Sequence, residues 1–292
     1  MQMRFVQGGI RVKALVVVAI LLSVIFPVFA SGERAQLIKA ADAAFARGSG
    51  FSLDSYETSL RKAISTYEQA LNVIPEDEVQ TRAYVLDRLA QGYFELGFAY
   101  LTDRDAQEQA FGKGKDYALE SLRLDPQFVK AEQESFRTAL SRATDVKAVF
   151  WYGNNLGSYL NFHFLTALSG GMNDVKAAFE RAITLDESYL GGGPWRAIGS
   201  FLAKVPSFLG GDKVKARDAF ARAIKIAPDF LENYVDDAEY VAKPSKDWNE
   251  FCTELHTAVE KGKDAAVMSA WPLYNALALQ RANRLIAEGP CG

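Results

Sequence analysis

A short pattern of small and bulky residues recurs four times along this chain and constrains its fold more than any other feature. A small residue is followed after four positions by an aromatic or small one, after three more by a small one, and after five more by Pro or Glu. Steps of four and three keep the first three on one helical stripe, where small side chains let a neighbouring helix approach closely. The four copies are Ala63, Tyr67, Ala70, Pro75; Gly114, Ala118, Ser121, Pro126; Val175, Phe179, Ala182, Glu187; and Ala216, Phe220, Ala223, Pro228.

A second pattern precedes three of these copies and contains a glycine in the middle of a helical stretch. Glycine is unfavourable inside a helix, which indicates a position where two paired helices come close together. The copies are Tyr93, Leu96, Gly97, Tyr100; Leu156, Gly157, Leu160; and Trp195, Ile198, Gly199, Leu202.

Together the two patterns resemble the helix A and helix B signatures of the tetratricopeptide repeat. They predict an all-α fold: a tetratricopeptide-like array of helical hairpins, an α-solenoid, within a single domain over 31–292. Degenerate units are expected near 35–75, 79–126, 147–187 and 194–228, with room for an extra helix around 128–140. Helices over 229–287 are expected to cap the open end of the array, whose apolar face must be covered.

The first thirty residues read as a signal peptide. Arg4, Arg11 and Lys13 form a basic start, an apolar run follows, and Pro27 comes shortly before the small residue Ala30. This order predicts cleavage after Ala30 and export to the periplasm. The alternative is an uncleaved signal anchor, although the apolar run is short for a membrane span.

The charge of the remaining chain limits its partners. The leader contains three of the 33 basic residues and no acidic residue, which leaves 30 basic against 36 acidic residues. A general nucleic-acid binder needs a cationic surface, so this class is excluded.

Cys252 and Cys291 are the only cysteines. In an oxidising compartment a pair of this kind is read as a disulfide, here tying the C-terminal tail to an earlier helix. The alternative is two unpaired thiols.

Residues 147–231 also resemble the T-component proteins associated with bacterial TRAP transporters. The motifs that carry this resemblance are Lys147–Gly157 (KAVFWYGNNLG), Gly192–Gly199 (GGPWRAIG) and Leu209–Asp212 (LGGD). The resemblance implies a periplasmic repeat protein that forms a trimer and docks to the solute-binding component of a transporter for organic acids or hydrophobic ligands. Members of the family are often lipoproteins, and this chain has no cysteine after its apolar run for such an anchor.

The sequence shows no constellation that asks for catalysis, a metal or a cofactor. His163 and His256 each stand alone, and no group of residues has the spacing of metal ligands. The turn Gly191–Arg196 (GGGPWR) has two interpretations. It is either an anion site built from free backbone N–H groups and Arg196, or a tight turn between repeats with Trp195 in the core.

The repeat register predicts which side chains line the concave groove. In tetratricopeptide proteins the groove is lined by helix-A residues offset from the packing positions. An aromatic ring among amides and hydroxyls suits a peptide or a carboxylate. The corresponding residues are Gln91, Phe94, Phe98, Trp151, Asn154, Ser158, Asn161, Arg196 and Ser200.

These observations support two hypotheses. The first is a periplasmic scaffold that binds a partner protein, such as the solute-binding component of a TRAP-type transporter. The second is a small-molecule protein that holds an organic acid or lipid in its groove or in an oligomer pore. We expect binding and not catalysis in either case.

Overall fold

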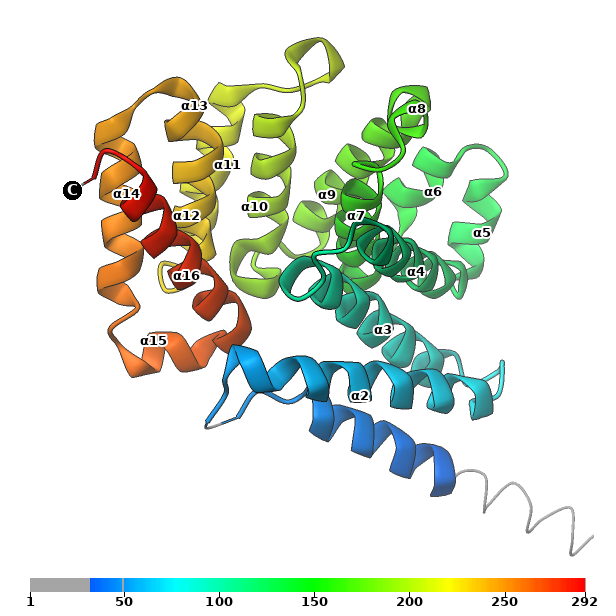
Figure 1. Ribbon diagram of the computed structural model, residues 1–292. Coiled ribbons are helices and arrows are strands. Elements are labelled where there is room, and N and C mark those ends of the chain that lie inside the picture. Colours follow the sequence, from blue (N-terminus) through cyan, green and yellow to red (C-terminus); the bar gives the residue numbers. More distant parts are fainter. Residues whose placement is uncertain (1–31, 49, 292) are drawn as a thin grey trace, which may run out of the picture.

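The computed structural model describes residues 32–48 and 50–291, and within them every regular element is a helix (Figure 1). The all-α fold class predicted from the repeat is therefore confirmed. The expected signal peptide, residues 1–30, lies outside the described residues. No helix of the described part is long and apolar enough to span a bilayer.

The helices follow one another with short connections. The first part of the array contains a helix over 32–45, α2 (Leu53–Val73), α3 (Val79–Ala99), α4 (Arg104–Arg123), α5 (Pro126–Glu132), α6 (Phe136–Arg142), α7 (Val146–Tyr159), α8 (Phe164–Thr166), the π-helical turn η1 (Ala167–Gly171) and α9 (Met172–Asp186). The second part contains α10 (Tyr189–Lys204), the 3₁₀ turn η2 (Ser207–Leu209), α11 (Lys213–Ile226), α12 (Glu232–Asp237), the π-helical turn η3 (Ala238–Ala242), α13 (Lys243–Ser245), α14 (Trp248–Lys261), α15 (Ala265–Ala270) and α16 (Pro272–Glu288).

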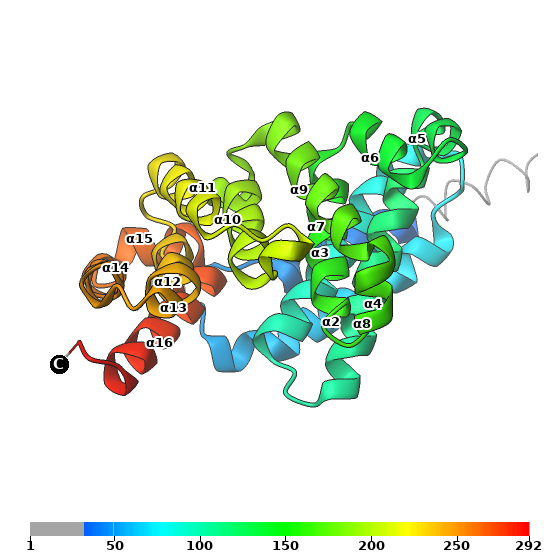
Figure 2. The ribbon, with the colours of Figure 1, turned by 90° about the horizontal axis from the view of Figure 1, so that it is seen from above.

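Hairpins form the array. Helix α3 packs on α4, α7 on α9 and α10 on α11, while α4–α7 and α9–α10 contacts join successive hairpins. Figure 2 shows these pairs following one another around the molecule. Each hairpin thus covers an apolar face of the next, as in other repeat proteins.

Glycine allows the close approach inside the hairpins, as the second pattern predicts. A Cβ on Gly97 would lie 2.8 Å from the Phe111 ring, and one on Gly199 would lie 3.1 Å from the Phe220 ring. In the α7–α9 pair the tight position is not the expected Gly157 but Gly153, whose Cβ would meet Phe179 at 2.7 Å. Aromatic residues of each B helix therefore rest directly on the backbone of the A helix.

The room left around 128–140 holds two short helices, α5 and α6, instead of one. Ser135 separates them, because its side chain accepts a hydrogen bond from the Thr138 backbone N–H and so caps α6. Phe128 and Leu140 are fully buried and join the main core.

The C-terminal helices cap the array and fold back toward its beginning. In Figure 1 the start of α16 lies beside α2, and contacts between these two helices bear this out. Among these capping helices, α15 ends before Trp271, since Pro272 has no N–H for helix continuation and instead begins α16. Cys252 of α14 and Cys291 form a disulfide with their Cα atoms 5.3 Å apart, which confirms the expected pairing.

Buried ionic contacts hold the two ends of the array together. The Glu95 side chain of α3 is fully buried and pairs with Arg47, which follows the first helix. The Arg47 guanidinium lies 5.6 Å from the centroid of the Tyr274 ring of α16. The fold is therefore closed across one side, and this closure creates the site described next.

Candidate functional site

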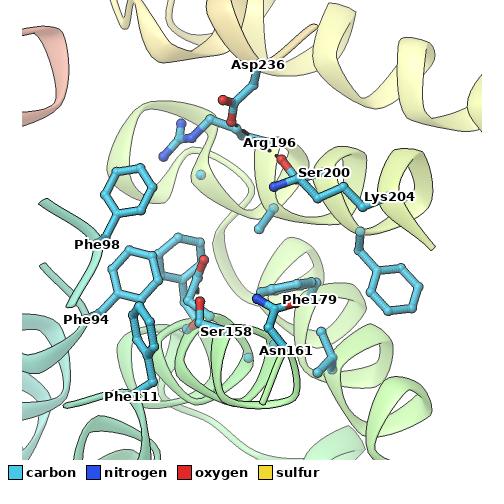
Figure 3. Close-up of a pocket in the computed structure, with 18 of the residues that line it drawn as sticks. Phe94, Phe98, Phe111, Ser158, Asn161, Phe179, Arg196, Ser200, Lys204 and Asp236 are labelled. Carbon is cyan, nitrogen blue, oxygen red and sulfur yellow. Dashed lines mark hydrogen bonds between the residues drawn. The ribbon is translucent and has the colours of Figure 1, made fainter. Parts of the chain in front are cut away.

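A cavity of about 390 Å³ lies inside the curve of the array, where α3, α7 and α10 face the C-terminal helices (Figure 3). Its volume falls in the range of roughly 300–1,000 Å³ that is usual for small-molecule sites. The lining divides into an aromatic wall, a polar strip and a charged end.

The aromatic wall comes from α3, α4 and α7. Phe94 stacks on Phe98 with their ring centroids 5.6 Å apart, and it also meets Trp151 at 5.5 Å and Phe111 at 6.0 Å. Trp151 is buried, and its indole N–H donates to the Tyr189 hydroxyl at 3.0 Å. The rings pack tightly against one another and form an apolar surface. Phe98 is 40% exposed and is therefore accessible to a ligand.

The polar strip follows one face of α7 and its C-terminal extension. The Asn154 amide donates to the Phe150 carbonyl at 2.8 Å, which leaves its own carbonyl oxygen for the cavity. Among the described residues, no side-chain partner bonds the Ser158 hydroxyl or the Asn161 amide, and both line the cavity. These groups are free to accept from or donate to a ligand.

The charged end joins α10 to the C-terminal helices. Arg196 of α10 pairs with Glu232 of α12 at 3.2 Å and donates to the side-chain amide oxygen (Oδ1) of Asn233 at 2.9 Å. Arg281 of α16 pairs with Asp236 at 2.9 Å. Burial raises the pKa of the Glu232 carboxyl above its ordinary value, although the neighbouring Arg196 opposes this shift.

Lys204 lies beside this network but outside its direct contacts. Its ammonium sits 3.7 Å from the centroid of the Tyr240 ring, a cation–π distance. Lys204 is exposed to solvent, although its ammonium lies close enough to the surrounding protein for desolvation to lower the pKa of Lys204 below its ordinary value. Figure 3 shows the side chain running back from the end of α10 toward Ser200.

The structure brings most of the predicted groove residues together. Those that line this one cavity are Phe94, Phe98, Trp151, Asn154, Ser158, Asn161, Arg196 and Ser200. Gln91 does not line it. Its amide is buried and donates to Glu95 at 2.8 Å, because the fully buried Glu95 carboxylate needs hydrogen-bond donors and Gln91 lies one turn away on the same helix.

Sequence reasoning missed other lining residues. Lys204 could have been found, since it follows Ser200 by one turn on the stripe that begins at Arg196. Asp236, Tyr240 and Arg281 had no comparable signal. They lie on helices that the repeat pattern identifies only as caps.

The glycine-rich turn before Arg196 is a tight connection between repeats. Leu190, Gly191 and Gly192 all have positive φ, and a Cβ on Gly191 would lie 2.2 Å from the Phe230 ring. The Arg196 guanidinium turns inward to Glu232, so it is not free for an anion on this turn. Trp195 is half-buried and not part of the core, and its indole donates to Glu187 at 2.8 Å.

Neither histidine belongs to a metal-binding cluster in the described part. His163 bonds the Glu108 carboxylate at 2.9 Å and stacks on Tyr159, whereas His256 is exposed. Within residues 32–48 and 50–291, no group of three or more His, Cys, Asp or Glu side chains has a geometry that could hold a metal ion.

A family model described as TRAP transporter T-component matches residues 102–290, which is more than half of the chain and covers α4 to α16. No curated protein shows significant similarity to the sequence.

Proposed function

Because this chain belongs to the TRAP transporter T-component family, we propose that it is an exported, non-catalytic scaffold that binds the solute-binding component of a TRAP-type transporter. The family match carries this proposal, since it spans nearly all of the elements around the cavity.

Two connections at one end of the molecule supply a surface for such a partner. The α7–α9 and α10–α11 connections both project from the top of the array in Figure 1 and face the viewer in Figure 2. They carry Phe164, Leu165 and Phe208, which are 69%, 81% and 83% exposed and which we call the rim patch. Large apolar side chains exposed on one face of a molecule are typical of a protein contact surface.

The rim patch adjoins the cavity. Phe162 of the first connection and Val205 of the second line the cavity wall, so a protein seated on the rim patch would also cover one end of the cavity. This placement suits a scaffold that works beside a solute-binding protein.

The test is binding between the purified chain and the purified solute-binding protein of a TRAP transporter from the same organism, followed by biolayer interferometry. The double variant Phe164→Ser/Leu165→Ser and the single variant Phe208→Ser should each weaken binding by about tenfold or more, since exposed aromatic anchors dominate such contacts. Val79→Ser, at a 45% exposed valine on α3, is the matched control. No binding by the unaltered protein would refute the partner, and equal binding by all variants would refute the surface.

The cavity supports a second candidate function, the binding of a small molecule. Its aromatic wall and free polar groups are typical of a ligand site. Native mass spectrometry of the protein purified from its own cells should detect a retained small molecule. If no small molecule is retained and organic acids and lipids do not shift the melting temperature, this function is contradicted.

The leader sequence and the Cys252–Cys291 disulfide support a periplasmic location. Cell fractionation with N-terminal sequencing should find the protein in the periplasm, beginning at Ser31. The trimer implied by the family resemblance is tested by sedimentation velocity, where a monomer at micromolar concentration would oppose it.

A further inference from the structure

The charged end of the cavity holds two guanidinium groups that are already bound within the protein. Arg196 contacts Glu232 and Asn233, while Arg281 contacts Asp236 and, at 3.6 Å, Glu232. A ligand anion that approached either guanidinium would have to displace a buried carboxylate, which leaves an unpaired buried charge and is strongly unfavourable. These arginines therefore organise the wall and do not serve as the anchor for a ligand.

Lys204 differs from both arginines. Among the described residues, no carboxylate lies within salt-bridge distance of its ammonium, and no hydrogen bond to that ammonium is formed. Its contact is the face of the Tyr240 ring, so its N–H donors remain available to a ligand.

Polar groups share this end of the cavity with Lys204. Ser200 lies one turn earlier on α10, and its hydroxyl makes only a long, 3.5 Å contact with Asp236. The Asn161 amide points into the same space from the opposite side (Figure 3). Beyond these groups the lining becomes aromatic, with Phe94 and Phe98.

We propose that the cavity binds a small amphipathic monocarboxylate, with its carboxylate on the Lys204 ammonium and its apolar body against Phe94 and Phe98. This inference rests on the second candidate function, the binding of a small molecule, and names the class of that molecule. A dicarboxylate does not fit, because Glu232, Asp236 and Glu239 already face the two guanidiniums and, among the described residues that line the cavity, no further cation is left for a second charge.

Isothermal titration calorimetry with three probes of equal chain length tests the proposal: octanoate, 1-octanol and suberate. Octanoate should bind most tightly. Lys204→Met should weaken octanoate binding roughly 10- to 100-fold, the effect of one lost charge-assisted hydrogen bond, and should leave 1-octanol binding unchanged. Lys213→Met, at an exposed lysine that does not line the cavity, is the control and should bind octanoate like the unaltered protein.

Equal binding of octanoate and 1-octanol, tighter binding of suberate, or an unchanged octanoate affinity in Lys204→Met would overturn the proposal. Binding to the solute-binding protein is measured on the same samples. If that protein binds and none of the probes does, the ligand class is wrong while the scaffold function stands. Circular dichroism of Lys204→Met confirms that a loss of octanoate binding is not a loss of fold.

Discussion

The Tyr274 hydroxyl donates a 2.6 Å hydrogen bond to the Glu95 carboxylate, although the two residues are 179 positions apart in the chain. Glu95 lies on α3 and Tyr274 on α16, and both are buried. This contact joins the capping helices to the beginning of the array. It holds the C-terminal wall of the cavity against the repeats.

Removal of this hydroxyl should loosen that junction. Tyr274→Phe leaves the buried Glu95 carboxylate with one donor fewer, so the free energy of unfolding should fall by about 1.5–3 kcal/mol in urea denaturation. The contrasting variant is Tyr100→Phe, because the Tyr100 hydroxyl is buried without a hydrogen-bond partner among the described residues. Tyr100→Phe should leave the free energy of unfolding unchanged or raise it. An equal decrease in the free energy of unfolding of both variants would show that the hydrogen bond between Tyr274 and Glu95 does not stabilise the fold.

The Cys252–Cys291 disulfide should stabilise the C-terminal cap. It closes a loop between residues separated by 39 positions, for which about 2–4 kcal/mol is expected. Cys252→Ser/Cys291→Ser should therefore melt at a lower temperature than the oxidised protein. Reductant should lower the melting temperature of the unaltered protein and leave that of the double variant unchanged. Two titratable thiols in the unfolded, unreduced protein would contradict the pairing.

A pair of buried carboxyls should make stability depend on pH. Burial raises the pKa of Asp237 to about 7, with further contributions from Glu250 and Glu254, and burial beside Glu250 raises the pKa of Glu254 to about 7. Arg217 opposes the shift at Asp237. In the unfolded chain such groups titrate near 4, so the folded state holds more protons between about pH 4 and pH 7. The free energy of unfolding should therefore decrease as pH rises through this window.

Asp237→Asn tests this pH dependence. It should raise the free energy of unfolding at pH 8 by about 2 kcal/mol and make the profile between pH 5 and pH 8 flatter, because the buried charge is gone. Asp218→Asn, at an exposed aspartate on α11, is the control and should keep the original slope. A steeper profile in Asp237→Asn would contradict the assignment.

The glycine at the start of α10 should not tolerate a side chain. Gly191 has φ of +63°, and its missing Cβ would overlap the Phe230 ring, so Gly191→Ala should cost about 2–5 kcal/mol in urea unfolding. Gly210 also has a positive φ, of +100°, but nothing lies within 4 Å of its Cβ position. Gly210→Ala should therefore cost only the backbone strain of roughly 1–2 kcal/mol. An equal cost at both positions would mean that contact with Phe230 is unimportant.

The groove face of α7 illustrates how far sequence reasoning reaches. Trp151, Asn154, Ser158 and Asn161 follow one another at helical spacing, so their common face can be read directly from the chain, and all four line the cavity. Gln91 satisfied the same rule and was misplaced. Its orientation depends on Glu95, a charge whose burial no local pattern reveals.

What the sequence alone determined is the series of helical hairpins, because small and aromatic residues at steps of three and four act between neighbours in the chain. The face of α7 also follows from local spacing. The two cysteines favoured a disulfide, but only the tertiary structure brought Cys252 and Cys291 together. Only the tertiary structure decided that the C-terminal helices return to the first repeats and supply Asp236, Tyr240 and Arg281 to the cavity. That return depends on the sum of the angles between successive hairpins and on contacts such as Glu95 with Tyr274, which no periodicity encodes.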